Sequence, residues 1–298
     1  MTSRRRVALA TCAEYATLDE DDQLLLAPLG ARGIDAVPLV WDVPADWAAF
    51  DAVIIRQTWD CAERGPEFLA WVERVAADTP LLNPPPVVAW SMDKRYIRDL
   101  TADGVPCVPT TFLEPGDSWS LPTSGEYVVK PTDSAGSRNT ARYGPGDSDR
   151  ADAHIRRLHA EGRCVMLQPY LASVDAQGES ALLYFDGVFS HTARKGPLLT
   201  REAAVTELLF IRESITPREV RPEELAVAEA ALASARARTG VGPPLYARVD
   251  LVDDPTGAPM VLELEMVEPS VFLVTDPGAA DRFAAAIDSR VTPRVRRT

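Results

Sequence analysis

Residues 245–270 read LYARVDLVDDPTGAPMVLELEMVEPS, two runs of strand-forming residues on either side of a turn-rich linker. The linker contains Asp, Pro and Gly, so the two runs are predicted to pair as an antiparallel hairpin. Side chains alternate along a strand, so Arg248 and Asp250 share one face, as Glu263 and Glu265 do on the second strand. Counting back from the turn pairs Asp250 with position 262 or 263. The three carboxylates are therefore expected to converge across the hairpin.

Converging carboxylates indicate a metal site. Like charges directly opposite one another destabilise a sheet unless something neutralises them. Carboxylate oxygens suit Mg²⁺, which normally keeps water and phosphate oxygens in its shell. The alternative is an acidic hairpin that faces solvent, but the two runs are otherwise apolar, which favours the metal. Asp250, Glu263 and Glu265 are the candidate ligands, while Glu268 falls on the opposite parity, just before Pro269, and ranks below them.

Two lysines occupy positions suited to an anion. Lys130 ends a predicted strand, 126–130, and the small-residue loop 133–138 that follows can turn its backbone N–H groups toward a phosphate. Lys94 begins a predicted helix, 92–103. Each lysine taken alone is also typical of a solvated surface. The chain contains no Gly-x-x-x-x-Gly-Lys-Ser/Thr, and no Gly-x-Gly-x-x-Gly follows a strand, which excludes a P-loop and a dinucleotide fingerprint.

The first 86 residues alternate strand and helix signals, which predicts βαβ units and a parallel sheet. Ligands of such sheets bind where the strands end. The run Arg-Gln-Thr-Trp-Asp at 56–60 follows the third strand and is therefore a candidate site. The Asn-Pro-Pro-Pro run at 83–86 is expected to close this first domain. The predicted strands are 7–12, 34–41 and 51–56, and the predicted helix between the first two is 19–32.

The remainder of the chain shows a less regular order of elements. A helix rich in Ala and Arg is predicted over 151–161, and a second helix, with Pro in its first turn, over 222–238. Residues 164–171 are predicted to form a strand, and 178–193 a hairpin. The long polar stretch 195–221 has no clear assignment, and the tail 290–298 is basic and expected to be disordered.

The charge of the chain argues against a nucleic-acid binder. Its 298 residues carry 31 Lys+Arg against 44 Asp+Glu, a net charge of −13, which would repel a polyanion at most approaches. No apolar window approaches the length of a transmembrane helix, and the apolar stretch 7–13 is too short for a signal peptide. The four cysteines are scattered without a Cys-x-x-Cys, which is typical of reduced thiols in a cytoplasmic enzyme rather than of disulfides or zinc.

Taken in order, these motifs resemble the ATP-grasp ligases, near the glutathione synthetase and ribosomal-protein glutamate ligase branch. The resemblance covers about residues 88–275. Each piece is weak, but the ordered set is specific. The set comprises Lys94, Lys130 before Pro131, the loop 134–138, the hinge strand 166–171, Gly178-Glu179, Lys195, Arg248-x-Asp250, and Glu263-Leu-Glu265 before Pro269-Ser270.

The resemblance implies an α/β protein with the ATP-grasp fold. An N-terminal βαβ domain that precedes the grasp would span 1–86. Two α+β subdomains that clasp ATP would follow, a central one with its entry helix over 87–172 and a C-terminal one over 173–298. The stretch 195–221 would then be a lid that excludes water from a reactive intermediate.

The resemblance also implies the roles of individual residues. Lysines 94 and 130 would hold ATP phosphates, the hinge would read the adenine edge, and Arg248 would stabilise charge on the transferred phosphoryl group. The metal triad of the family is usually Asp, Glu and Asn, so Glu265 is a departure that adds a charge. Two Mg²⁺ ions are implied, bound through Asp250, Glu263 and Glu265. The implied ATP-binding residues are Lys94, Lys130, Ser134, Gly136, Ser137, Gln168, Tyr170, Leu171, Glu179 and Lys195.

Three further motifs look most like the ligases that form D-cycloserine in antibiotic biosynthesis: 7–14, 56–60 and 263–270. Such a ligase activates the carboxylate of O-ureido-D-serine as an acyl-phosphate, closes the isoxazolidinone ring and loses the carbamoyl group, releasing ADP and phosphate. No side-chain nucleophile is needed, in keeping with the lack of any Ser/His/Asp or Cys/His set.

By the same resemblance, Arg56, Thr58 and Ser270 would line the amino-acid pocket, with Arg56 a natural partner for a carboxylate. The alternative for Arg56 is a structural salt bridge. Two other functions stay open: an amino-acid or dipeptide ligase of another natural-product pathway, and an ATP-binding module without turnover. The expected partner is a small amino-acid-like substrate, with neither nucleic acid nor membrane, and a homo-oligomer is a further expectation because related ligases often form dimers or tetramers.

Overall fold

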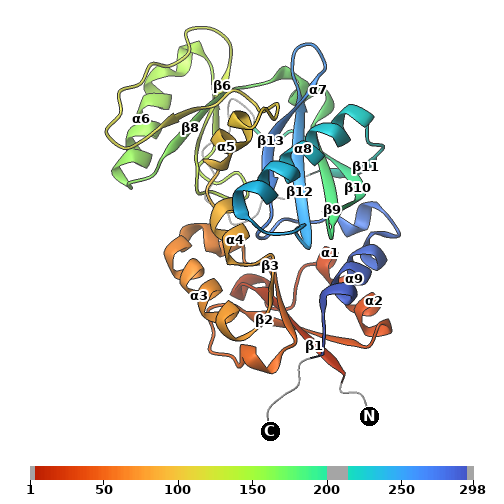
Figure 1. Ribbon diagram of the computed structural model, residues 1–298. Coiled ribbons are helices and arrows are strands. Elements are labelled where there is room, and N and C mark those ends of the chain that lie inside the picture. The colour runs from red at the N-terminus through yellow and green to blue at the C-terminus, as the bar shows by residue number, and fades with distance from the viewer. Residues whose placement is uncertain (1–3, 200–213, 294–298) are drawn as a thin grey trace.

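The computed structural model of the protein describes residues 4–199 and 214–293, and within them three sheets are arranged around a central region (Figure 1). The sheets are built from strands within residues 5–82, 111–169 and 179–265. The α/β class predicted from the sequence is confirmed. The domain boundaries at 86/87 and 172/173 stay a prediction. No described helix combines the length and apolar character needed to cross a membrane.

The first sheet is parallel, in the order β2-β1-β3-β4. Both of its faces are covered, which explains why its strands are nearly continuous apolar runs. Alternate residues of β1 point to opposite sides: Val7 and Leu9 pack toward α2 and α9, whereas Ala8 and Ala10 pack toward α3. The strands are β1 (Arg5–Thr11), β2 (Ile34–Val40), β3 (Ala52–Gln57) and β4 (Leu81–Leu82), and the covering helices are α2 (Leu26–Ala31), α3 (Gly65–Asp78) and α9 (Ala279–Arg290).

The single helix predicted over 19–32 is wrong, because the structure has two short helices there, α1 (Glu20–Gln23) and α2. Asp19 caps α1, accepting a hydrogen bond from the backbone N–H of Asp22 at 2.9 Å. In a continuous helix the amide of residue 28 would donate to the carbonyl of residue 24, but Pro28 has no amide hydrogen. Proline therefore divides a stretch whose apolar pattern looked uniform.

The second sheet has the order β5-β8-β6-β7 and carries helix α6 on one face. All of its pairings are antiparallel. The side chains of Ile155 and Leu158 on α6 are fully buried against Tyr127 and Val129 of β6. The elements are β5 (Thr111–Leu113), β6 (Tyr127–Pro131), β7 (Ala141–Tyr143), α6 (Ser148–Ala160) and β8 (Val165–Pro169).

The third sheet is antiparallel, in the order β11-β10-β9-β12-β13, and the hairpin predicted from residues 245–270 is its last pair of strands. Asp250 pairs with Glu263 and Arg248 pairs with Glu265, with a β-bulge after Asp250. Helix α8 covers the opposite face through buried alanines. The elements are β9 (Glu179–Phe185), β10 (Val188–Lys195), β11 (Ile215–Arg218), α8 (Pro222–Thr239), β12 (Tyr246–Asp253) and β13 (Pro259–Glu265).

Short helices join these sheets. The helix predicted over 92–103 begins later than expected, because Lys94 lies between α4 (Pro85–Ser91) and α5 (Tyr96–Ala102) rather than within a helix. Its backbone N–H donates to the carbonyl of Thr132, which fixes this junction beside the end of β6. Part of the predicted lid, 200–213, and the end of the tail, 294–298, lie outside the described residues. The remaining elements are α7 (Ala172–Gln177) and the 3₁₀ turns η1 (Ala13–Tyr15), η2 (Trp47–Ala49), η3 (Trp59–Glu63), η4 (Pro145–Asp147) and η5 (Leu273–Thr275).

Candidate active site

A cavity of about 960 Å³ opens where elements of the three sheets meet. Its volume is at the upper end of the range for small-molecule sites. Of the site residues predicted from the sequence, all but Asp250, Arg56 and Thr58 line it. The predicted residues in its wall are Lys94, Lys130, Ser134, Gly136, Ser137, Gln168, Tyr170, Leu171, Glu179, Lys195, Arg248, Glu263, Glu265 and Ser270.

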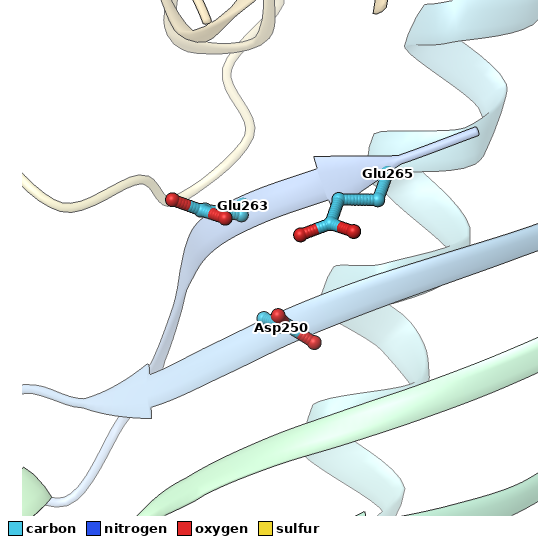
Figure 2. Close-up of side chains that lie close together, drawn as sticks. All are labelled: Asp250, Glu263 and Glu265. Carbon is cyan, nitrogen blue, oxygen red and sulfur yellow. The ribbon is translucent and has the colours of Figure 1, made fainter. Parts of the chain in front are cut away.

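Three carboxylates from two neighbouring strands lie close together, and two of them, Glu263 and Glu265, line this cavity (Figure 2). Asp250 lies on β12 and is fully buried, while Glu263 and Glu265 lie on β13 and are half-buried. One carboxylate oxygen from each lies within 4.8 Å of the others. The strand register produces this arrangement, because Asp250 is directly opposite Glu263 and the parity of β13 brings Glu265 to the same face.

Cations neutralise this group of acids. Arg248 donates from Nε to Asp250 Oδ1 at 2.9 Å and from Nη2 to Glu265 Oε1 at 2.5 Å. Lys195 lies 2.8 Å from Asp250 Oδ2 and 2.8 Å from Glu179 Oε2. Lys130, at the end of β6, reaches across from the second sheet to Glu263 Oε1 at 2.8 Å. The acids and their cations thus connect the second sheet to the third.

The pKa values of the three acids reflect this balance. Burial opposes ionisation of Asp250, but the charges of Arg248 and Lys195 outweigh it and lower the pKa of this carboxyl. Glu263 is affected in the same way, and Lys130 is the first of the cations that lower its pKa. Burial raises the pKa of Glu265 to about 8, because Arg248 offsets it only in part and the neighbouring acids add to it. The group therefore holds two firmly ionised carboxylates and one that a further cation would ionise.

The donor set fits a divalent cation of the Mg²⁺ type. Its ligand atoms are carboxylate oxygens, which hard cations prefer. Their spacing within 4.8 Å allows more than one of them to contact one ion. Burial, and after it the charges of Asp250 and Glu263, raise the pKa of Glu265, and a bound cation would favour its ionised form. Asp250, Glu263 and Glu265 are the described residues that could hold it.

All three lysines of the chain line the cavity. Lys94 is half-buried and its Nζ donates to the backbone carbonyl of Ser134, at the start of the small-residue loop. In that loop Gly136 and Ser137 both have a φ of 59°, a left-handed conformation that turns successive backbone N–H groups outward. Lysines and loop therefore form a cationic wall suited to phosphate groups.

The predicted hinge, 166–171, comprises most of β8 and the link from β8 to α7. Gln168 turns its side chain away toward Thr110, donating to Oγ1 at 2.8 Å. Tyr170 is fixed by its hydroxyl, which donates to Asp175 at 2.6 Å, and by Arg142 stacked on its ring. Leu171 adds an apolar surface beside them. These three residues can therefore contact a ligand chiefly through backbone atoms and through a flat apolar surface.

Arg56 and Thr58 do not line the cavity, so the structure does not support the prediction that they meet the substrate. Arg56 is 1% exposed and makes two hydrogen bonds of 2.9 Å to Asp22 of α1. Its guanidinium lies over the rings of Tyr246 and Phe283. The structural salt bridge considered as the alternative is what the structure shows.

The segment 56–61 instead contacts the backbone of the turn that follows β13. Trp59 Nε1 donates to the carbonyl of Glu268 at 3.0 Å, and Arg56 Nη2 donates to the carbonyl of Pro269 at 3.1 Å. This turn places the side chains of Glu268 and Ser270 in the cavity wall.

Sequence reasoning missed two sets of cavity residues. Glu268 was ranked low on strand parity, but β13 ends at Glu265, so parity does not extend to it. The acidic first turn of α1, including Asp21, also lines the cavity. Asp21 accepts hydrogen bonds from the backbone N–H groups of Leu273 and Val274. Its acidic residues signal only a helix start, so the sequence carries no sign of this role.

Comparisons with known proteins identify the family of this chain. Residues 7–83 match the family model described as D-cycloserine synthetase DcsG, N-terminal domain. Cycloserine biosynthesis protein DcsG of Streptomyces lavendulae is 42% identical over 299 residues, which cover 96% of this chain and 99% of that protein. The crystal structure of D-cycloserine synthetase DcsG superposes with a TM-score of 0.87 at 40% identity, covering 96% of this chain and 100% of the other.

More distant structures share the fold. D-alanine–D-alanine ligase from Bacillus anthracis, solved in complex with ATP, has a TM-score of 0.63 at 15% identity over 95% of each chain. The ATP-grasp ligase PsnB, solved with Mg and ADP, has a TM-score of 0.60 at 17% identity, covering 98% of this chain and 99% of the other. The ATP-grasp fold expected from the sequence is thus confirmed. The chain belongs to the D-cycloserine synthetase DcsG family, and it is an ATP-dependent ligase of the ATP-grasp fold.

Proposed function

We propose that this enzyme closes O-ureido-D-serine to D-cycloserine at the expense of ATP, releasing ADP and phosphate. The observation that carries the proposal is 42% identity along 96% of the chain to a cycloserine biosynthesis protein. The cavity supports it, because cationic and acidic walls face a common space large enough for a nucleotide and a small amino acid.

The cationic wall is proposed to bind the nucleotide. Lys94 and Lys130 would hold phosphate oxygens as point charges, and the loop 134–137 would add backbone N–H groups. The hinge 169–171 would meet the adenine through backbone atoms and the flat surface of Tyr170. Lys195 and Glu179 lie between this wall and the acidic hairpin, 2.8 Å apart.

Asp250, Glu263 and Glu265 are proposed to hold two Mg²⁺ ions. When bound, these ions offset the charge that develops on the phosphoryl group during transfer. The chain's own contribution is to fix the carboxylates in position through Arg248, Lys195 and Lys130. The neighbouring ligases named above were solved with ATP or with Mg and ADP, which supports the same ligand class here.

The chemistry is proposed to proceed in two steps within one cavity. The substrate carboxylate attacks the γ-phosphoryl group of ATP and gives an acyl-phosphate and ADP. The ureido nitrogen that is bonded to oxygen then attacks the acyl carbon, and phosphate leaves. The carbamoyl group leaves that nitrogen as isocyanic acid, which gives the unsubstituted ring. Arg248 holds two carboxylates and the Ser270 carbonyl, at 3.1 Å, so its guanidinium is fixed where negative charge develops. Positioning and charge stabilisation suffice, and no side-chain nucleophile takes part.

The cellular setting belongs to the same proposal. All four cysteines are free thiols, and three of them are buried, which suits an enzyme of the reducing cytoplasm. The partner is proposed to be a small amino-acid-like substrate, as the size of the cavity suggests. The oligomeric state stays a prediction.

The proposal is tested by ADP release with O-ureido-D-serine, compared with a panel of free amino acids and their pairs. We expect ADP with O-ureido-D-serine and a product with the mass of D-cycloserine. Glu263→Gln should lower this rate by about 10²-fold or more, because it removes a metal ligand and the partner of Lys130. Glu14→Gln, an exposed acid outside the cavity, is the matched control. ADP release only with other amino acids would contradict the proposal and indicate a different amino-acid ligase.

A further inference from the structure

Four acids of the cavity wall form no ion pair with the described residues: Asp19, Glu20 and Asp21 at the start of α1, and Glu268 after β13. Asp250 and Glu265 pair with Arg248, Glu263 pairs with Lys130, and Glu179 pairs with Lys195. Glu268 lines the same cavity, yet it forms no ion pair with any residue in the described ranges 4–199 and 214–293. Its role is therefore not that of a charge partner within the fold.

The backbone and surroundings of Glu268 are nevertheless firmly fixed. Its carbonyl accepts the indole N–H of Trp59 at 3.0 Å, and the next carbonyl, of Pro269, accepts Arg56 Nη2 at 3.1 Å. The thiol of Cys61 interacts with the Glu268 carboxyl, and Cys61 is only 1% exposed. Two segments far apart in sequence thus hold one carboxyl at the cavity wall. Hydrogen bonds that fix the backbone in this way are typical of a side chain whose position is important for function.

The second step of the proposed reaction requires a proton acceptor. The attacking nitrogen carries a hydrogen that must leave as the new carbon–nitrogen bond forms. A positioned carboxylate is a common acceptor, and it works best when its pKa lies near the operating pH. Resting on the function proposed above, we propose that Glu268 is the catalytic base of ring closure, taking the proton from the nitrogen that attacks the acyl-phosphate. The carbon–nitrogen bond forms, the carbon–oxygen bond to phosphate breaks, phosphate leaves with that electron pair, and the proton moves to an Oε of Glu268. The carbamoyl group then leaves the same nitrogen as isocyanic acid, and one proton of its NH2 group passes to the ring nitrogen, which keeps the electron pair of the broken bond.

The other acids of the cavity are less suited to this step. Asp250 and Glu263 are held ionised by cations, which makes them weak proton acceptors. Burial raises the pKa of Asp21 to about 6, but both of its carboxylate oxygens accept backbone N–H groups. Glu265 is paired with Arg248 at 2.5 Å and belongs to the group of three acids. Burial raises the pKa of Glu268 to about 7, and the charges of Lys94 and Arg248 only partly offset that effect. The other titratable groups that face it are Cys61 of η3 and Tyr246 of β12.

The test separates the two steps of the reaction. Glu268→Gln keeps the shape of the side chain but cannot accept a proton. We expect it to lower D-cycloserine formation by about 10²-fold or more. Formation of the acyl-phosphate should continue, and it is measured by exchange of ¹⁸O from the β,γ-bridge of ATP into non-bridging positions in the presence of O-ureido-D-serine. Glu14→Gln, exposed on η1, is the matched control for both readouts.

Two further readouts distinguish a base from a structural or binding group. In the wild type, product formation should rise with pH through about 7, because Glu268 must lose its proton to act. Glu268→Asp should keep part of the activity and this rise, and Glu268→Gln should lose both. Trp59→Phe, which removes the hydrogen bond to the Glu268 carbonyl and keeps an aromatic ring beside Tyr15, should lower kcat for ring closure more than it raises KM.

The outcomes are distinguishable. Equal loss of isotope exchange and of product in Glu268→Gln would overturn the inference, because the residue would then serve binding or the first step. An increase in KM for the amino acid with unchanged kcat would also overturn it. If the wild type does not release ADP with O-ureido-D-serine, the proposed function fails. The same comparison, made with whichever amino acid does stimulate ADP release, then decides the role of Glu268, since any nitrogen nucleophile must lose a proton.

Discussion

At the scale of single residues, Glu265 is where this chain departs from the triad usual in the ATP-grasp ligases. Its carboxylate lies beside Asp250 and Glu263 and is paired with Arg248 at 2.5 Å. Burial and two neighbouring acids raise its pKa to about 8, so it is the least firmly ionised of the three. A bound cation gains an extra charge partner from this glutamate that an asparagine would not supply.

Glu265→Asn should therefore weaken the binding of Mg²⁺ to this group of side chains. Asparagine keeps an oxygen ligand but removes one carboxylate, so the Mg²⁺ concentration for half-maximal rate should rise by about tenfold. The rate at saturating Mg²⁺ should be retained in large part. The measurement is a Mg²⁺ titration of ADP release beside wild type and Glu14→Gln. An unchanged titration midpoint would show that Glu265 does not contact the metal.

The pair Asp22–Arg56 is the second residue-scale feature with a measurable consequence. The two side chains are 2% and 1% exposed and 2.9 Å apart. Arg56→Met alone leaves a buried, uncompensated carboxylate and should cost about 3–5 kcal/mol of unfolding free energy. The double variant Arg56→Met/Asp22→Leu removes both charges and should recover at least about 2 kcal/mol of that loss.

Urea-induced unfolding of the two variants measures this difference. Equal destabilisation of the single and double variants would mean that the lost contact to the Pro269 carbonyl, and not the buried charge, dominates.

Arg56 also shows what a sequence motif can and cannot predict. The run at 56–60 was rightly placed at the end of a parallel strand, but residue type does not reveal that a buried acid, Asp22, captures the guanidinium.

At the scale of elements, the pairing of β12 with β13 could be predicted because it depends on local rules. Alternation assigns the faces, and the turn between the runs sets the register to within one residue. The β-bulge between Asp250 and Leu251 determines the exact register, and nothing in the sequence indicates where this bulge lies. The sequence thus predicts that the three carboxylates lie together, whereas the register shift depends on the packing of the whole sheet.

Helices were harder to predict where one residue changes the backbone. Pro28 divides α1 from α2, and the turn around Lys94 separates α4 from α5. Helix α3, with buried Trp71 and Val75, was not predicted at all, although it begins with a Gly-Pro pair that suits a first turn. Its apolar face is recognisable only against the sheet that it covers.

Gly178 links two elements that carry site residues. It precedes β9, has a φ of 74°, and a Cβ there would overlap the backbone carbonyl oxygen of Lys195 on β10. Gly178→Ala should therefore cost about 1–3 kcal/mol in strain and shift Lys195 relative to Asp250 and Glu179. We expect lower stability together with a larger loss of ADP release than the stability change alone accounts for.

The matched control is Gly30→Ala in α2, where a Cβ meets nothing within 4 Å and φ is not positive. It should leave activity unchanged and alter unfolding free energy by less than about 1 kcal/mol, in the stabilising direction. Thermal unfolding and initial rates of both variants are the readouts. Similar behaviour of the two alanines would show that the contact at Gly178 is absent in solution.

At the scale of the whole molecule, Asn83 joins the first sheet to the third. Its buried amide donates to the carbonyls of Tyr246 at 2.9 Å and Met266 at 2.8 Å, and its oxygen accepts the N–H of Leu245 at 2.7 Å. These partners flank the hairpin that carries the metal ligands. A single side chain at the end of β4 thus fixes the N-terminal sheet relative to the site.

Asn83→Gly should loosen this junction without straining the backbone, because Asn83 has a φ of 70° that glycine adopts freely. Loss of three hydrogen bonds and of their buried partners should reduce unfolding free energy by about 3 kcal/mol. Chemical denaturation followed by tryptophan fluorescence, which reports chiefly on the N-terminal part, and by far-UV circular dichroism measures the change. A loss below about 1 kcal/mol would show that water replaces the amide without cost.

The net charge of −13 is unevenly distributed over the molecule. The three lysines and Arg248 gather at the cavity, and Lys130, Lys195 and Arg248 pair with acids of the hairpin, while many other acids face solvent. Composition argues against a polyanion partner, but it does not show that the lysines gather at one cavity inside the fold.

The location of all three lysines has a practical consequence for chemical labelling. Apart from the α-amino terminus, the primary amines of this chain lie in the cavity, and Lys130 and Lys195 are 5% and 7% exposed. Amine-directed dyes, cross-linkers and coupling resins will therefore react at Lys94 or the terminus, and reaction at Lys94 blocks the site. A reactive nucleotide analogue labels this enzyme selectively for the same reason, whereas immobilisation on a sensor surface requires carboxyl or terminal coupling.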